Sequence, residues 1–171
     1  MDSLVVVLRL VHVVCGALWV GMVFLSTFFL LPAVEDAGPD GGKVVAAMQR
    51  RGLMTVIPIL AIGALVSGIW LYLRASAGMP AEFGRSRMGM AFGLGGLAAI
   101  VAWLLGMVVA RPSMMRAMAL AQSLGSSTSA EERQRVMNEV QRLRARSAAS
   151  GRMTAYLLVF AVAAMAVARY L

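Results

Sequence analysis

One stripe of the first apolar segment carries side chains that could bind a soft metal ion. His12, the single histidine among 171 residues, is followed by Cys15, Trp19 and Met22 at spacings of three, four and three. Residues at these spacings share one face of an α-helix. An imidazole, a thiol and a thioether suit copper(I), and histidine, alone or with methionine, also holds a haem iron. His12, Cys15 and Met22 are therefore candidate metal ligands, and His12 is the candidate cofactor ligand.

The same stripe can also be explained by packing alone. An ionisable side chain inside an apolar segment often marks a functional site. A lone polar residue there, however, ordinarily forms a hydrogen bond with a neighbouring helix. The apolar segments contain no Asp, Glu or Lys that could complete a metal site, so we favour packing and expect no cofactor. Haem b or copper at His12 is the alternative.

The composition predicts that lipid surrounds the helix that positions this stripe. Hydrophobic residues make up 60% of the chain, charged residues make up only 14%, and the mean hydropathy is +0.80. A soluble domain is roughly half apolar and about a quarter charged, so this chain cannot cover a water-soluble globule of its size. In a membrane protein an excess of Lys and Arg sets the orientation, and we expect no nucleic-acid partner.

Four apolar segments are long enough to cross a bilayer as α-helices. They cover about residues 4–31, 53–73, 90–110 and 153–171. At 1.5 Å per residue the first would extend about 42 Å, more than the ~30 Å hydrocarbon core requires, so it must tilt or protrude. Because proline interrupts a helix, Pro32 is predicted to end the first helix. The third apolar span is predicted to end at Arg111-Pro112, with its helix continuing beyond the bilayer. The glycines and proline of residues 35–43 predict a turn-rich loop.

The segment 112–150, between the third and fourth apolar segments, is predicted to form a helical hairpin. Gly125 is a typical residue to end its first helix. Ser129 and Glu132 have the spacing of the capping box that opens a second helix. The predicted fold is therefore all-α: a four-transmembrane-helix bundle with a cytoplasmic helical hairpin extension between helices 3 and 4, forming a single integral membrane domain over residues 1–171.

The second helix of this hairpin should have a short apolar face. Val136, Val140 and Leu143 follow one another at spacings of four and three, which places them on one side of a helix. Ser147, at the next step, does not extend the stripe.

The basic residues predict which side of the membrane each loop occupies. In a four-span chain the loops after the first and third segments share one side. Of the 16 Lys and Arg residues, eleven lie on that side and five lie on the side of the termini. The positive-inside rule then places the eleven in the cytoplasm and both termini outside, in a bacterial-type cytoplasmic (inner) membrane.

Small residues spaced four apart could form close helix contacts. Such faces let helices approach closely in membranes, either within the chain's own bundle or on a partner. The candidate packing residues are Ala17, Gly21, Gly63, Ala64, Ser67, Gly68, Gly89 and Gly93. Other membrane protein subunits are therefore expected partners, besides the lipid bilayer itself.

The segment from His12 to Gly21, HVVCGALWVG, resembles the first helix of CopD-like copper-resistance membrane proteins, and HemJ-type protoporphyrinogen oxidases share a similar helix. The Arg50-Arg51 pair, the Ser67–Trp70 segment (SGIW) and the Arg111-Pro112 pair are similar to the same pattern. The resemblance covers the first two thirds of the chain loosely, and its motifs are short. It implies a four-helix bundle, with a copper or haem b role carried over only to His12. Haem-binding relatives use further histidines, so this chain cannot hold a haem between two histidines of its own.

Three functions follow from these patterns. The first is a non-catalytic accessory subunit that packs on a larger energy-transducing membrane complex, respiratory or photosynthetic, and it is favoured by the glycine-rich faces. The alternative is a CopD-like bundle that binds haem b or copper at His12. The third is a small-solute transporter, although the apolar segments offer no acid or lysine for an ion relay. An enzyme is not expected because His12 is the only base in the spans, and a HemJ-like redox role is the exception left open.

Overall fold

The computed structural model describes residues 3–123 and 129–171. Within these ranges the secondary structure is all helical, and four helices are long and apolar enough to cross a membrane. This confirms the predicted all-α class with four candidate spans. The elements in chain order are α1 (Ser3–Leu25), η1 (Ser26–Leu30), α2 (Leu31–Asp36), η2 (Gly38–Asp40), α3 (Gly41–Arg50), α4 (Leu53–Ala75), α5 (Pro80–Phe83), α6 (Arg87–Leu105), η3 (Gly106–Ala110), α7 (Arg111–Ser123) and α8 (Ala130–Ala168).

Two of the long helices run on past a proline, Pro32 in the first and Pro112 in the third. α1, η1 and α2 form one continuous helix, as do α6, η3 and α7. In the π-helical segments η1 and η3, the next amide, that of Leu31 or Arg111, bonds to the carbonyl five residues back. Pro32 and Pro112 follow directly. A proline ring clashes with the carbonyl four residues back in a regular α-helix, and the wider π turn relieves that clash. The predicted helix end at Pro32 is therefore wrong, whereas the third helix continues past the end of its apolar span into α7.

The predicted loop over residues 35–43 is also partly helical. η2 is a single 3-10 turn, and α3 follows it at once and packs beside α2. Gly41 lies so close to the carbonyl of Val34 that a Cβ atom at Gly41 would collide with it. Lys43 pairs with Asp40 at 2.6 Å on the exposed side. Adjacent glycines suggested a turn, whereas here one of them lets two short helices approach closely.

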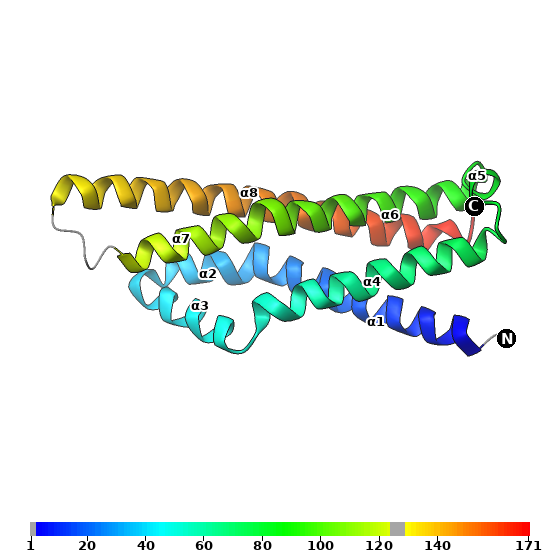
Figure 1. The fold of residues 1–171 in the computed structure, drawn as a ribbon, viewed down its shortest axis with the longest axis horizontal. Coiled ribbons are helices and arrows are strands. Elements are labelled where there is room, and N and C mark those ends of the chain that lie inside the picture. The colour runs from blue at the N-terminus through cyan, green and yellow to red at the C-terminus, as the bar shows by residue number, and fades with distance from the viewer. Residues whose placement is uncertain (1–2, 124–128) are drawn as a thin grey trace.

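The long helices form two antiparallel pairs (Figure 1). α1 packs along α4, and the α6–η3–α7 helix packs along α8, while the contacts between the two pairs are fewer. Both termini and α5 lie at one end of the bundle, and α3 lies toward the other end. Small residues dominate the core, which consists of Trp19, Ala61, Ala64, Ala98, Ala99, Ala102, Leu158 and Ala161.

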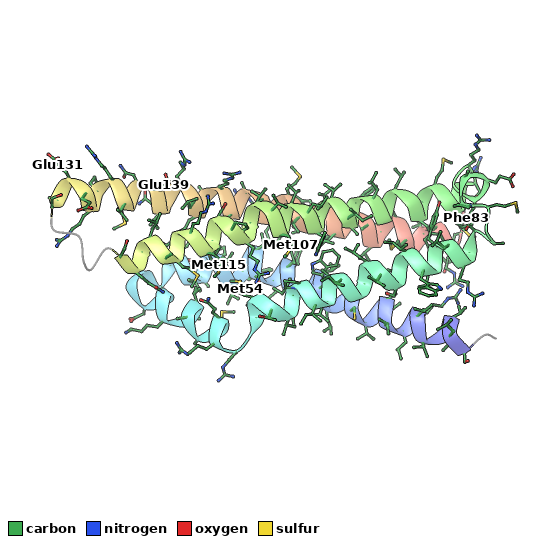
Figure 2. The ribbon with its side chains drawn as sticks, in the orientation of Figure 1. Met54, Phe83, Met107, Met115, Glu131 and Glu139 are labelled. Carbon is green, nitrogen blue, oxygen red and sulfur yellow. The ribbon has the colours of Figure 1, made fainter. Side chains whose placement is uncertain are left out.

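α7 and the first part of α8 pack side by side at the end away from the termini. Figure 2 shows Glu131 and Glu139 on this part of α8. The hydroxyl of Ser129 accepts a hydrogen bond from the amide of Glu132 at 3.2 Å, which confirms the predicted N-cap. The predicted helix end at Gly125 lies outside the described residues. The cytoplasmic placement of this hairpin stays a prediction.

The buried face of α8 continues beyond its apolar stripe. Val140 and Leu143 are buried against Ala117 of α7. Ser147 is buried as well, and its hydroxyl donates a hydrogen bond to the carbonyl of Ala110 at 3.1 Å. The apolar stripe thus ends at Leu143, and the buried face continues through Ser147, because a serine that bonds a backbone carbonyl can lie in a helix interface within a membrane protein.

Candidate functional site

The His12 stripe faces α4, and its imidazole already has a partner there. The Nδ1 atom of His12 lies 2.8 Å from the carbonyl oxygen of Ala64. The ring fits against Gly68, where an added Cβ would lie 2.7 Å from the imidazole Cε1 atom. Gly68 therefore provides the space that the imidazole occupies, and any larger residue at that position would displace the ring.

The other members of the stripe pack against the same helix. Cys15 lies against Gly63, where an added Cβ would be 3.0 Å from the cysteine sulfur. Trp19 is 4% exposed and belongs to the core. Ser67 is buried and donates its hydroxyl to the carbonyl of Gly63 at 2.6 Å and to that of Ala64 at 3.2 Å. The small residues of α4 thus receive the side chains of α1.

The three candidate metal ligands do not fit a single ion. His12 and Met22 are ten positions apart, which is about 15 Å along a helix, so they cannot coordinate one metal together. Among the described residues, no group of three or more His, Cys, Asp or Glu side chains could hold a metal ion. A site at His12 would need ligands from outside the described part of this chain.

One feature of His12 still resembles a ligand. A metal-bound histidine usually donates its second ring nitrogen to a carbonyl or carboxylate, which fixes the ring orientation. Nδ1 of His12 makes such a contact with Ala64. Its Nε2 atom has no hydrogen-bond partner within residues 3–123 and 129–171. The ring is therefore oriented with one nitrogen free.

The remaining packing candidates lie in different places. A Cβ atom at Gly89 would collide with a backbone carbonyl at the end of α5, so Gly89 is needed for the turn into α6. A Cβ at Gly93 would lie 3.8 Å from the hydroxyl of Tyr72, an ordinary contact with α4. Ala17 and Gly21 lie on the exposed side of α1, and a Cβ at Gly21 would have nothing within 4 Å. Only the last pair is open to a partner.

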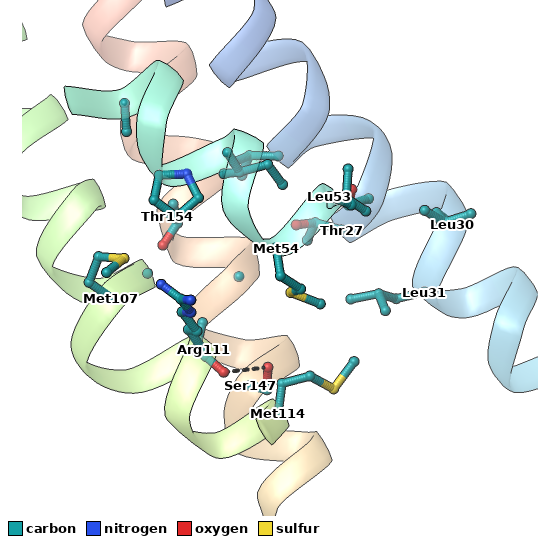
Figure 3. A pocket seen from close by; sticks show the side chains of 18 of the residues that line it. Thr27, Leu30, Leu31, Leu53, Met54, Met107, Arg111, Met114, Ser147 and Thr154 are labelled. Atoms are coloured by element: carbon teal, nitrogen blue, oxygen red, sulfur yellow. Dashed lines mark hydrogen bonds between the residues drawn. The ribbon is translucent and has the colours of Figure 1, made fainter. Parts of the chain in front are cut away.

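A cavity of about 200 Å³ lies between the two helix pairs, and the sequence analysis did not predict it. Both π segments line it, together with α3, the first part of α4, and α8. Figure 3 shows Leu31, Met54 and Met114 pointing toward one another there. Its wall is apolar apart from a few hydroxyls, the indole of Trp103 and the side chain of Arg111.

Two polar groups of the cavity wall lack partners. Arg111, which is exposed, is the only charged residue among the described residues of the wall, and it forms no ion pair with any of the residues that the structure describes. The indole N–H of Trp103 is buried and has no acceptor among the same residues. Buried polar groups are nearly always hydrogen-bonded, so an unmatched donor requires an explanation.

Hydroxyl groups of α8 support the π segment on the wall of the cavity. Ser150 donates to the carbonyl of Leu105, just before η3, at 3.3 Å, and Ser147 donates to Ala110 at its end. At Gly106 nothing lies within 4 Å of the position that a Cβ would take, so the cavity is open beside it. The sequence signal for the two π segments is a proline six residues after the first residue of each: Pro32 follows Ser26, and Pro112 follows Gly106.

The resemblance to the CopD-like and HemJ-type proteins rests on the residues of this sequence alone. The copper and haem b roles that it implies for His12 therefore stay predictions. No protein-family model, curated protein or solved structure matches this chain.

Proposed function

We propose that this chain is a non-catalytic accessory subunit that packs on a larger energy-transducing membrane complex through the outer face of α1. The observation that carries the proposal is the exposed pair Ala17 and Gly21, on the side of α1 that faces away from α4. Small residues four apart let a second helix approach closely in lipid, where van der Waals packing drives association.

The burial of α1 supports the same proposal. Of the most apolar stretch of the α1–η1–α2 helix, 6% of the residues are buried within the chain, against 28% for α8. Large apolar side chains flank the small pair along the exposed face, among them Leu10, Val14 and Phe24. This face has the shape that a partner helix needs: a shallow groove at Ala17 and Gly21 between larger ridges.

A matched pair of substitutions tests the proposal. Gly21 and Gly96 both have open space where a Cβ would lie, so leucine at either position leaves the bundle intact. If a partner helix lies on α1, Gly21→Leu should separate the chain from its complex, whereas Gly96→Leu on α6 should not. Native mass spectrometry of the chain purified from its own membrane reads the difference. A wild-type chain that runs alone, or equal assembly of both variants, would refute the proposal.

A second candidate function is haem b or copper binding at His12. The free Nε2 atom and the contact of Nδ1 with the Ala64 carbonyl favour it. Since His12 is the only histidine, the further ligands would come from a partner chain. The measurement is the absorption spectrum and metal content of the protein purified from its membrane, where a Soret band or bound copper would support this function.

We also propose that both termini lie outside and that the end carrying α3 and α7 lies in the cytoplasm. The support is the excess of Lys and Arg in the connections at that end, and both termini lie at the opposite end (Figure 1). A reporter enzyme that works only outside the cytoplasm should be active when it is fused after Leu171. Activity of a reporter that works only in the cytoplasm would reverse the orientation.

A further inference from the structure

We propose that the cavity between the helix pairs binds an anionic phospholipid, with an acyl chain between the pairs and the phosphate against Arg111. This site is independent of the α1 face, because it lies on the inner side of the pairs and not on their outer surface.

The depth of the cavity matches the outer part of a lipid leaflet. On α4 its lining runs from Leu53 to Ala61, which is about 12 Å along the helix. α4 begins just after Arg50 and Arg51, and both of these arginines are exposed. Basic residues beside an apolar span mark the interface with the headgroups. The cavity therefore begins at headgroup level and extends into the hydrocarbon layer.

The wall of the cavity suits a flexible hydrocarbon chain. An apolar cavity of about 150 Å³ holds a benzene ring in another protein, and this one measures about 200 Å³. Four methionines contribute to its wall, and their unbranched side chains adapt to an irregular occupant. They are Met48, Met54, Met107 and Met114. An acyl chain from the surrounding membrane fits this surface better than water does.

The charge of the wall selects an anionic headgroup. Arg111 is the only charged residue of the cavity and lies where the apolar α6–η3 segment passes into the more polar α7. A neighbouring hollow of about 70 Å³ is lined by Glu35 and Arg152, whose opposite charges cancel, so the net positive charge near the cavity comes from Arg111. A guanidinium binds phosphate oxygens in a fork geometry, and basic pockets between membrane helices bind anionic headgroups.

Tryptophan fluorescence provides a direct test. Of the three tryptophans, Trp19 and Trp103 line the cavity and Trp70 is on the exposed surface of α4. In a Trp70→Phe background the remaining fluorescence comes from the two tryptophans that line the cavity. A phospholipid with brominated acyl chains then quenches this fluorescence only when an acyl chain enters the cavity. Phosphatidylglycerol should quench saturably at about a fivefold lower concentration than phosphatidylcholine with the same chains, which is the ~1 kcal/mol that one basic residue contributes near an anionic lipid.

Three variants decide whether the quenching comes from this site. Arg111→Gln should abolish the fivefold preference, whereas Arg116→Gln, at an exposed position outside the cavity wall, should keep it. Gly106→Leu should fill the cavity and remove saturable quenching by both lipids while the far-UV circular dichroism stays unchanged. The proposal fails if both lipids quench equally, if the preference survives Arg111→Gln, or if quenching survives Gly106→Leu.

Discussion

The two helix pairs of this bundle are held together in different ways. Three hydroxyl groups of α8 donate to backbone carbonyls of the α6–η3 helix, from Ser147, Ser150 and Thr154. Between α1 and α4, the Nδ1 atom of His12 lies 2.8 Å from the carbonyl oxygen of Ala64. α8 buries more than four times as large a share of its apolar stretch as the helix that begins with α1.

This difference indicates which part of the molecule is scaffold. Buried small residues bring α6 and α8 close together, and hydroxyl–carbonyl bonds between them fix the π segment that lines the cavity. α1 is attached on one side and leaves its small pair, Ala17 and Gly21, open. We infer that the α6–α8 pair carries most of the stability and that α1 is available for a partner.

The largest effect is expected from a wedge in the α6–α8 pair. Ala102 is 0% exposed and its carbonyl accepts from Thr154. Ala102→Leu should lower the free energy of unfolding by about 1–3 kcal/mol, the usual effect of overpacking. The control is Val101→Leu, at a neighbouring exposed position. Unfolding in mixed detergent micelles, followed by circular dichroism, gives both values, and equal losses would contradict the scaffold role of this pair.

A smaller effect is expected at His12. His12→Ala removes one interhelical hydrogen bond, which contributes about 0.6 kcal/mol in membranes and at most about 1.7. Gly68→Ala should be harmful in the wild type, because its methyl group displaces the imidazole, and nearly neutral when His12 is already alanine. A double-mutant cycle measures this coupling, and Val13→Ala on the exposed side of α1 is the control. If the effects of His12→Ala and Gly68→Ala on stability are additive, the imidazole and Gly68 are not in contact.

The same His12→Ala protein separates packing from ligation. If the imidazole only packs, pigment and metal content should not change. If it ligates haem or copper, losing the only histidine should remove the cofactor while Val13→Ala retains it.

Hydropathy and capping rules predicted the parts of this fold that depend on local sequence. The four spans follow from long apolar runs, and the N-cap at Ser129 follows from the residues that surround it. The continuation of the first helix through Pro32 could not be predicted in this way, because the rule that proline ends a helix assumes regular α-helical geometry, whereas a π turn precedes this proline. The position of Ser147 depends on a carbonyl 37 residues away.

The candidate site was predictable to a smaller extent. Helical spacing placed His12 correctly on a face that meets another helix, but it could not identify the Ala64 carbonyl as the partner. Spacing also grouped His12 with Met22, because a shared face says nothing about distance along the helix axis. The cavity depends on how two helix pairs meet, which no local pattern encodes. Its wall comes from segments between Trp19 and Thr154.

The proposed role of α1 is tested most directly by photo-crosslinking in the native membrane. A photoreactive residue is placed at Leu18, beside the small pair, or at Leu97 on the exposed side of α6, since both are exposed within the chain. We predict one crosslinked protein product of discrete mass from Leu18, absent when Gly21→Leu is combined with it, and only lipid adducts from Leu97. Lipid adducts alone from Leu18, or the same protein product from both positions, would contradict the assignment of α1 as the docking helix.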